Sequence, residues 1–115
     1  MSKLKKVPAS FYETANGKEP ARDWLLGLDP ESRRIVGRDI ATAEFGWPVG
    51  MPLSRNLGGG LFEIRSNISG KRIARVIFEV RRGRMVLLHG FVKKSQKTPK
   101  SDLDLARQRA KEITK

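Results

Sequence analysis

The sequence contains no cysteine and a single histidine, His89. Without cysteine the chain has no disulfides, thiolate zinc sites, iron–sulfur clusters or cysteine nucleophiles, and one histidine is too few for a histidine-built metal cage. No apolar run approaches the roughly 20 residues that span a bilayer, and the N-terminus lacks a segment of signal-peptide type. We therefore expect a cytoplasmic protein that makes no membrane contact and uses no cofactor or metal.

Acidic side chains are also scarce. The 115 residues include 12 Asp and Glu but 24 Lys and Arg, which gives a formal net charge of +12. The 38% hydrophobic and 31% charged content fits one globular domain over residues 1–115. The charge is uneven: residues 1–60 carry +2, whereas residues 61–90 and 91–115 carry +5 each. Clustered positive charge indicates polyanion binding, and a generic solvated basic surface is the alternative.

The first half of the chain has the pattern of one strand and two helices. Val7–Glu13 alternates weakly and predicts a strand. A helix is expected from Glu19, because apolar residues recur at helical spacing. Asp29–Pro30 has the form of an N-cap followed by proline, so it predicts the start of a second helix that ends at Gly46. The short connection favours an antiparallel helix pair.

The segment from Gly46 to Gly60 holds five glycines and two prolines in fifteen residues. This composition is too broken for a helix or a central strand, so it predicts a loop that crosses from the helices to a sheet. The run Gly58-Gly59-Gly60 lacks the spacing of nucleotide-binding glycine motifs, which argues against a nucleotide pocket.

Three strands and a helix are expected in the second half. Leu61–Ser66, Ile73–Val80 and Met85–Val92 alternate in strand fashion, and Arg82–Gly83 predicts a tight reversal between the last two. A helix begins at Ser101 with a capping-box-like pattern. Together with the first half, this order predicts an α+β fold.

Arg65 and Arg75 are the first candidate site residues. Both lie within expected strands, on the face opposite the most apolar one, so pairing of the strands would project both guanidinium groups from one concave sheet surface. Arginine donates paired hydrogen bonds to phosphate oxygens and stays charged. The alternative is a salt bridge to Glu63 or Glu79.

His89 is the one side chain whose ordinary pKa lies near neutrality, and it ends the expected central strand. It is a candidate general acid or base on a phosphodiester, and the alternative is a packed, hydrogen-bonded histidine. Phe91 lies two residues on and therefore on the same face, where it could stack on an unpaired base or belong to the core.

A basic segment follows the expected central strand. Its four lysines in eight residues can neutralise several phosphates, or they can line a solvated loop. The expected C-terminal helix adds a basic stripe. The candidate RNA-binding cations are Lys93, Lys94, Lys97, Lys100, Arg107 and Lys111.

Several of these segments resemble the phage-derived HigB branch of the RelE/ParE toxin superfamily. The resemblance is carried by Phe45-Gly46-Trp47-Pro48, by Leu57 to Arg65, by Arg75 to Phe78 and by Leu87 to Pro99. It implies a RelE-like α+β fold in which two N-terminal helices and a C-terminal helix pack on a mainly antiparallel sheet. It also implies the toxin of a type II toxin–antitoxin module that enters the ribosome and cleaves mRNA.

The resemblance also implies roles for the candidate residues. Arg65 and Arg75 would clamp the phosphate, His89 with Lys93 or Lys94 would transfer protons, and Lys97 would bind the ribosomal RNA or mRNA backbone. The expected partners are the ribosome, mRNA and a helix-turn-helix, HigA-like antitoxin that forms a hetero-oligomer with the toxin. A ParE-like gyrase inhibitor or an inactive phage-derived binding protein is the alternative, because the same fold serves both activities.

Overall fold

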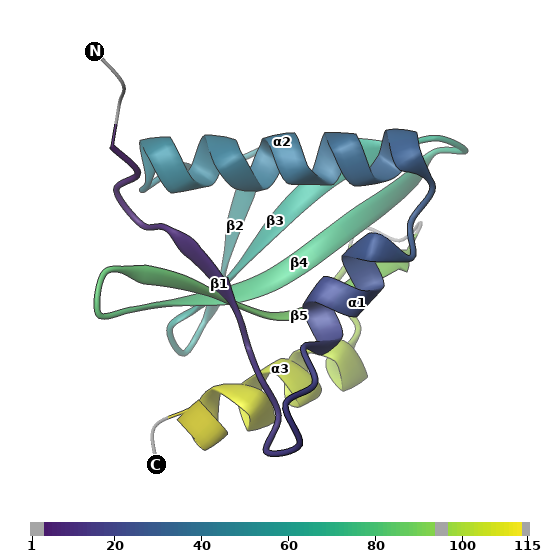
Figure 1. Cartoon of the computed structure of the whole chain (residues 1–115). Helices are drawn as coiled ribbons and strands as arrows, with labels where there is room; N and C mark the ends of the chain where they lie inside the picture. The colour runs from purple at the N-terminus through teal and green to yellow at the C-terminus, as the bar shows by residue number, and fades with distance from the viewer. Residues whose placement is uncertain (1–3, 94–96, 114–115) are drawn as a thin grey trace.

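A computed structural model of the chain describes residues 4–93 and 97–113. A five-stranded sheet forms its centre, in the order β1-β5-β4-β3-β2, and three helices cover it (Figure 1). Among the strands of the described residues, only the β1–β5 pair is parallel. The elements are β1 (Ala9–Phe11), α1 (Pro20–Leu26), α2 (Pro30–Gly46), β2 (Ser54–Gly58), β3 (Leu61–Ile68), β4 (Arg72–Arg81), β5 (Arg84–Lys93) and α3 (Lys100–Ile113).

The first two helices cover one face of the sheet. Asp29 caps α2 by accepting a hydrogen bond from the Ser32 backbone N–H at 3.1 Å, and Pro30 follows it, as the sequence predicts. The short connection between α1 and α2 is also confirmed. α1 packs on β5 and α2 on β3, so the sheet is the main support of both helices. The core on this face contains Val36, Ile40, Ala43, Ile64, Val76, Phe78 and Leu87.

The third helix covers the opposite face, where it packs on β4 and β5 (Figure 1). Its apolar side chains recur at helical spacing and include the fully buried Ala106. They pack on a second cluster that contains Tyr12, Leu61, Ile77, Leu88 and Phe91. The sheet is therefore covered by helices on both faces.

The expected α+β class is confirmed, with a mostly antiparallel sheet and three helices, and one expectation is wrong. Residues 46–60 are not entirely a loop, because Ser54–Gly58 forms β2 and pairs with β3. Glycine and proline obscure this short strand in the sequence, but it lies at the sheet edge, where such residues are tolerated. β1 covers only three residues of the strand expected over 7–13.

Gly90 in β5 permits the closest contact between α1 and the sheet. A Cβ atom placed on Gly90 would lie 2.2 Å from Cε3 of Trp24, so only glycine fits beneath the indole ring. This contact fixes α1 against β5 between His89 and Phe91, whose side chains face the other way, toward α3.

Candidate functional site

Arg65 and Arg75 lie directly opposite each other on β3 and β4, so the expected pairing is confirmed. The structure does not confirm the expected exposure of the two guanidinium groups. Arg75 is fully buried, and the Arg65 side chain is only 10% exposed. α3 packs on this face against β4 and β5, where Arg75 lies beside the buried Phe91 ring. Arg65, on β3, lines a pocket with Ile35, Arg38 and Asp39 of α2. Neither guanidinium group therefore projects from an open concave surface.

Glu63 supplies the negative charge beside these arginines. It is fully buried on β3, and its Oε1 lies 3.7 Å from Nε of Arg65. Its other oxygen, Oε2, accepts a hydrogen bond from the Thr98 hydroxyl at 2.7 Å. Burial lowers the pKa of Arg75 from its usual value, and the charge of Glu63 opposes that shift. The alternative named from the sequence, an ion pair with Glu63, is thus formed, whereas Glu79 pairs with Arg81 at 2.9 Å.

His89 is paired with an acidic side chain. Its Nε2 lies 2.7 Å from Oδ1 of Asp102, in the first turn of α3, and both side chains are 16% exposed. Donation from Nε2 to the carboxylate leaves Nδ1 as the proton acceptor of the ring. An imidazole held in one tautomer by a carboxylate is suited to general acid–base chemistry.

Phe91 links the histidine to the buried arginine. Its ring stacks on the His89 ring, with 5.4 Å between centroids and an interplanar angle of 20°, which confirms that the two side chains share a face. The Cζ atom of Arg75, its register partner on β4, lies 5.8 Å from the same ring. Phe91 is 7% exposed and belongs to the core, so the expected stacking on an RNA base requires it to be uncovered.

These residues form one unit, which we call the charged cluster: Glu63, Arg65, Arg75, His89 and Asp102. The strands β3, β4 and β5 provide four of its members and α3 the fifth. The cluster combines a partly exposed acid–base group with two permanent positive charges. Such a set can bind a phosphate and move a proton.

The expected basic residues fall into two groups. Lys93, Lys97 and Lys100 are exposed in the segment around the charged cluster, and Lys100 also pairs with Asp104 at 2.7 Å. Lys94 lies outside the described residues. Arg107 and Lys111 are exposed farther along α3, where they line a separate groove. The structure therefore separates the stripe on α3 from the lysines near His89.

Sequence reasoning missed Asp102 and Thr98 as members of this site. Asp102 has a local signal, since an acidic side chain in the first turn stabilises a helix, but that signal explains it without His89. Thr98 gives no signal at all. Both acquire their partners only when α3 docks on the sheet.

The sequence matches the family described as "Phage derived protein Gp49-like (DUF891)" over residues 23–111. The chain belongs to this family. Gp49-like proteins are associated with the toxins of toxin–antitoxin modules. The match includes every residue of the charged cluster. Comparison with curated proteins gives no match.

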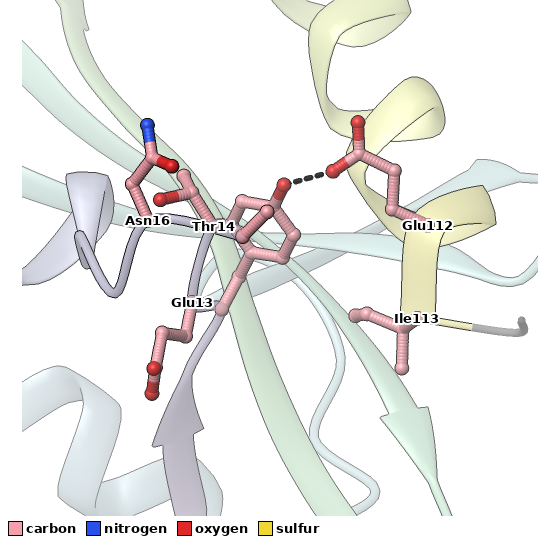
Figure 2. A pocket seen from close by; sticks show the side chains of 7 residues that line it. Glu13, Thr14, Asn16, Glu112 and Ile113 are labelled. Atoms are coloured by element: carbon pink, nitrogen blue, oxygen red, sulfur yellow. Dashed lines mark hydrogen bonds between the residues drawn. The ribbon is translucent and has the colours of Figure 1, made fainter.

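In this Gp49-like chain a cavity of about 620 Å³ lies away from the cluster, between the end of β1 and the end of α3 (Figure 2). Glu13, Thr14 and Asn16 line it on one side, and on the other the Tyr12 hydroxyl donates a hydrogen bond to Glu112. That hydrogen bond, followed by burial, raises the pKa of Tyr12. Among the residues that the structure describes, no predicted site residue lines this cavity.

Two further observations concern the described residues alone. None of their helices is long and apolar enough to cross a membrane. In residues 4–93 and 97–113, no three His, Asp or Glu side chains are grouped so that they could hold a metal ion.

Proposed function

We propose that this Gp49-like protein is the toxin of a type II toxin–antitoxin module and acts as a ribosome-dependent endoribonuclease on mRNA. The observation that carries the proposal is the His89–Asp102 pair stacked on Phe91 above Arg75. His89 and the two arginines lie on one face of the sheet, in the half of the chain with most of the net charge, which supports proton transfer next to a bound phosphate. The family's association with toxins supports the same assignment.

The proposed chemistry is transfer of the phosphate to the neighbouring ribose hydroxyl. A base takes the 2′-OH proton, the 2′-oxygen bonds to phosphorus, and the bond to the 5′-oxygen breaks, which leaves a cyclic phosphate and a protonated 5′-hydroxyl. Nδ1 of His89 takes the proton from the 2′-oxygen or gives one to the 5′-oxygen. Lys93 or Lys94 transfers the proton at the other of these two oxygens. Asp102 is a positioning residue for the imidazole.

The two arginines stabilise the charge that develops on the phosphate. Arg65 is the less covered and reaches the phosphate from the rim of the cluster. Arg75 contributes its charge from beneath Phe91, at short range and in a low-dielectric setting. Lys97 and Lys100 bind the RNA backbone beside the site, where they are exposed.

The proposed partners are the ribosome with its mRNA and a HigA-like, helix-turn-helix antitoxin that binds the toxin in a hetero-oligomer. The support is the net charge of +12, which attracts RNA and favours an antitoxin with an acidic contact surface.

A reconstituted translation reaction tests the proposal. Wild-type protein should cut the translated mRNA, and His89→Gln should lower the cleavage rate by roughly 10²–10⁴, the usual contribution of a general acid or base. Arg34→Gln is the matched control, because it removes an exposed charge from α2 on the other side of the sheet. Uncut mRNA together with inhibited gyrase supercoiling would replace this function with the ParE-like one.

A further inference from the structure

The turn between β4 and β5 is rich in arginine. Arg81 ends β4, Arg84 begins β5, and these two residues are register partners that close the hairpin. Arg82 and Gly83 form the two-residue loop between them. Figure 1 shows this turn projecting at the left of the sheet, beyond all three helices. We call residues 81–84 the arginine turn.

The arginine turn carries positive charge that no nearby carboxylate balances. In the sequence, no acidic residue lies between Glu79 and Asp102. Both oxygens of Glu79 accept hydrogen bonds from Arg81 at 2.9 Å, so these two side chains balance each other. In residues 4–93 and 97–113, no carboxylate forms a salt bridge with Arg82 or Arg84, and both arginines are exposed. The turn therefore presents a positive charge of two to solvent, which favours an anionic ligand.

Arg82 has a backbone conformation that arginine rarely adopts. Its φ is 51° and that of Gly83 is 74°, so the loop has the form of a type I′ turn. Such a turn favours Asn, Asp or Gly at its first position, because larger side chains crowd the backbone at positive φ. Among the residues that the structure describes, Lys71 is the one other non-glycine residue with positive φ. An exposed arginine thus occupies position 82 at a cost to stability, which indicates a role outside the fold.

The surroundings of the arginine turn indicate which anion fits. Residues 79–86 contain no aromatic side chain, so the turn has no platform on which an unpaired base could stack. Val80 and Val86 are half-buried and Met85 is buried, so it also lacks the exposed apolar anchor of a protein interface. Helical RNA is recognised through its phosphates and ribose hydroxyls, and arginine suits phosphate oxygens. The chemistry of the turn therefore favours the backbone of double-stranded RNA.

The arginine turn is too far from the charged cluster to share a phosphate with it. Five residues of β5 separate Arg84 from His89, which is about 17 Å at the rise of an extended strand. One phosphate cannot contact both positions. The turn can therefore hold a helical region while the cluster holds a single strand.

We propose that the arginine turn binds the phosphate backbone of double-stranded RNA and docks the protein on the helical parts of its RNA target. The inference rests on the proposed function for the choice of RNA. It goes beyond that function, because the turn lies outside the charged cluster and cleaves nothing. Arg82 and Arg84 are the binding residues, and Arg81 is a positioning residue that Glu79 holds in place.

The test measures binding of an RNA duplex. A fluorescent duplex of about 16 base pairs is titrated between about 50 and 200 mM KCl against wild type, Arg82→Asn/Arg84→Gln and the control Arg22→Gln/Arg34→Gln. The control removes the same charge from exposed positions on α1 and α2. A DNA duplex of the same sequence and a polyglutamate peptide serve as alternative ligands.

The turn variant should bind the RNA duplex on the order of tenfold more weakly at the lower salt. Its slope of log affinity against log salt should be shallower by about 1.8, since each lost phosphate contact on a duplex contributes about 0.9. Equal affinities and slopes for the turn variant and the control would overturn the inference, as would a loss confined to the DNA duplex or to the peptide. Duplex binding that depends on the turn, in a protein that leaves mRNA uncut, would support the inference and contradict the proposed function.

The single variant Arg82→Asn separates binding from folding. Asparagine followed by Gly83 is a preferred pair for a type I′ turn, so the Tm should rise by about 2–4 °C. RNA-duplex affinity should nevertheless fall, because the charge is lost. A lower Tm for this variant would show that Arg82 serves the fold, and together with unchanged RNA affinity it would overturn the inference.

Discussion

Nε2 of His89 lies 2.7 Å from Oδ1 of Asp102, so one hydrogen bond joins β5 to the first turn of α3. The two residues are 13 positions apart. The same bond fixes the imidazole tautomer and joins α3 to the sheet beside Phe91, which stacks on His89. Orientation of the candidate acid–base group therefore depends on α3 docking.

Asp102→Asn tests this relationship. Asparagine keeps the size of the side chain but removes the charge that stabilises the imidazolium, so we expect mRNA cleavage to fall at least tenfold. The matched control is Asp104→Asn, which breaks only the exposed pair with Lys100. Cleavage rates in the translation reaction check both variants. Equal rates for Asp102→Asn and wild type would remove Asp102 from the site.

Glu63→Gln tests the electrostatics of the cluster. Glu63 is fully buried beside Arg65, and removing one member of a buried ion pair costs about 3–5 kcal/mol. Glu79→Gln serves as the comparison, because the Glu79–Arg81 pair is partly exposed and should contribute at most about 1 kcal/mol. Urea unfolding measures the free energies. Similar losses for the two variants would contradict a buried, mutually compensated cluster.

Gly90→Ala should destabilise the protein, because the new methyl group would overlap the Trp24 indole. Overpacking of this kind costs about 1–3 kcal/mol. The control is Gly37→Ala in α2, where a Cβ meets nothing within 4 Å and helix propensity predicts a gain of about 0.5–1 kcal/mol. Thermal and urea unfolding check both. A neutral Gly90→Ala would show that α1 does not pack closely on β5.

Tyr12→Phe should change how stability depends on pH. The hydrogen bond to Glu112 raises the pKa of Tyr12 above 10, so the folded state retains a proton that the unfolded state loses. This contribution is complete below about pH 10 and is lost as the pH rises through the folded pKa. The variant should lose about 1 kcal/mol at pH 8, with a smaller deficit at pH 11. Urea unfolding at the two values checks it, and a constant deficit would contradict it.

Local sequence signals predicted most of the secondary structure. The Asp29–Pro30 cap marked the start of α2, and strand alternation marked β3, β4 and β5. β2 was not predicted, because a short edge strand tolerates the glycine and proline that normally argue against a strand.

The candidate site could be predicted only in part. The shared face of His89 and Phe91 follows from their spacing of two in a strand, and the structure confirms it. The burial of Arg65 and Arg75 does not follow, because charged residues on alternate positions suggest a solvated face. Here a helix covers that face, and Glu63 balances the buried charge there.

Mapping of mRNA 5′ ends in cells after brief induction tests the central claim most directly. The account predicts new ends at fixed positions within codons of translated messages, which His89→Gln abolishes and Arg34→Gln retains. New ends that ignore the reading frame, or that persist at wild-type level in His89→Gln, would contradict it.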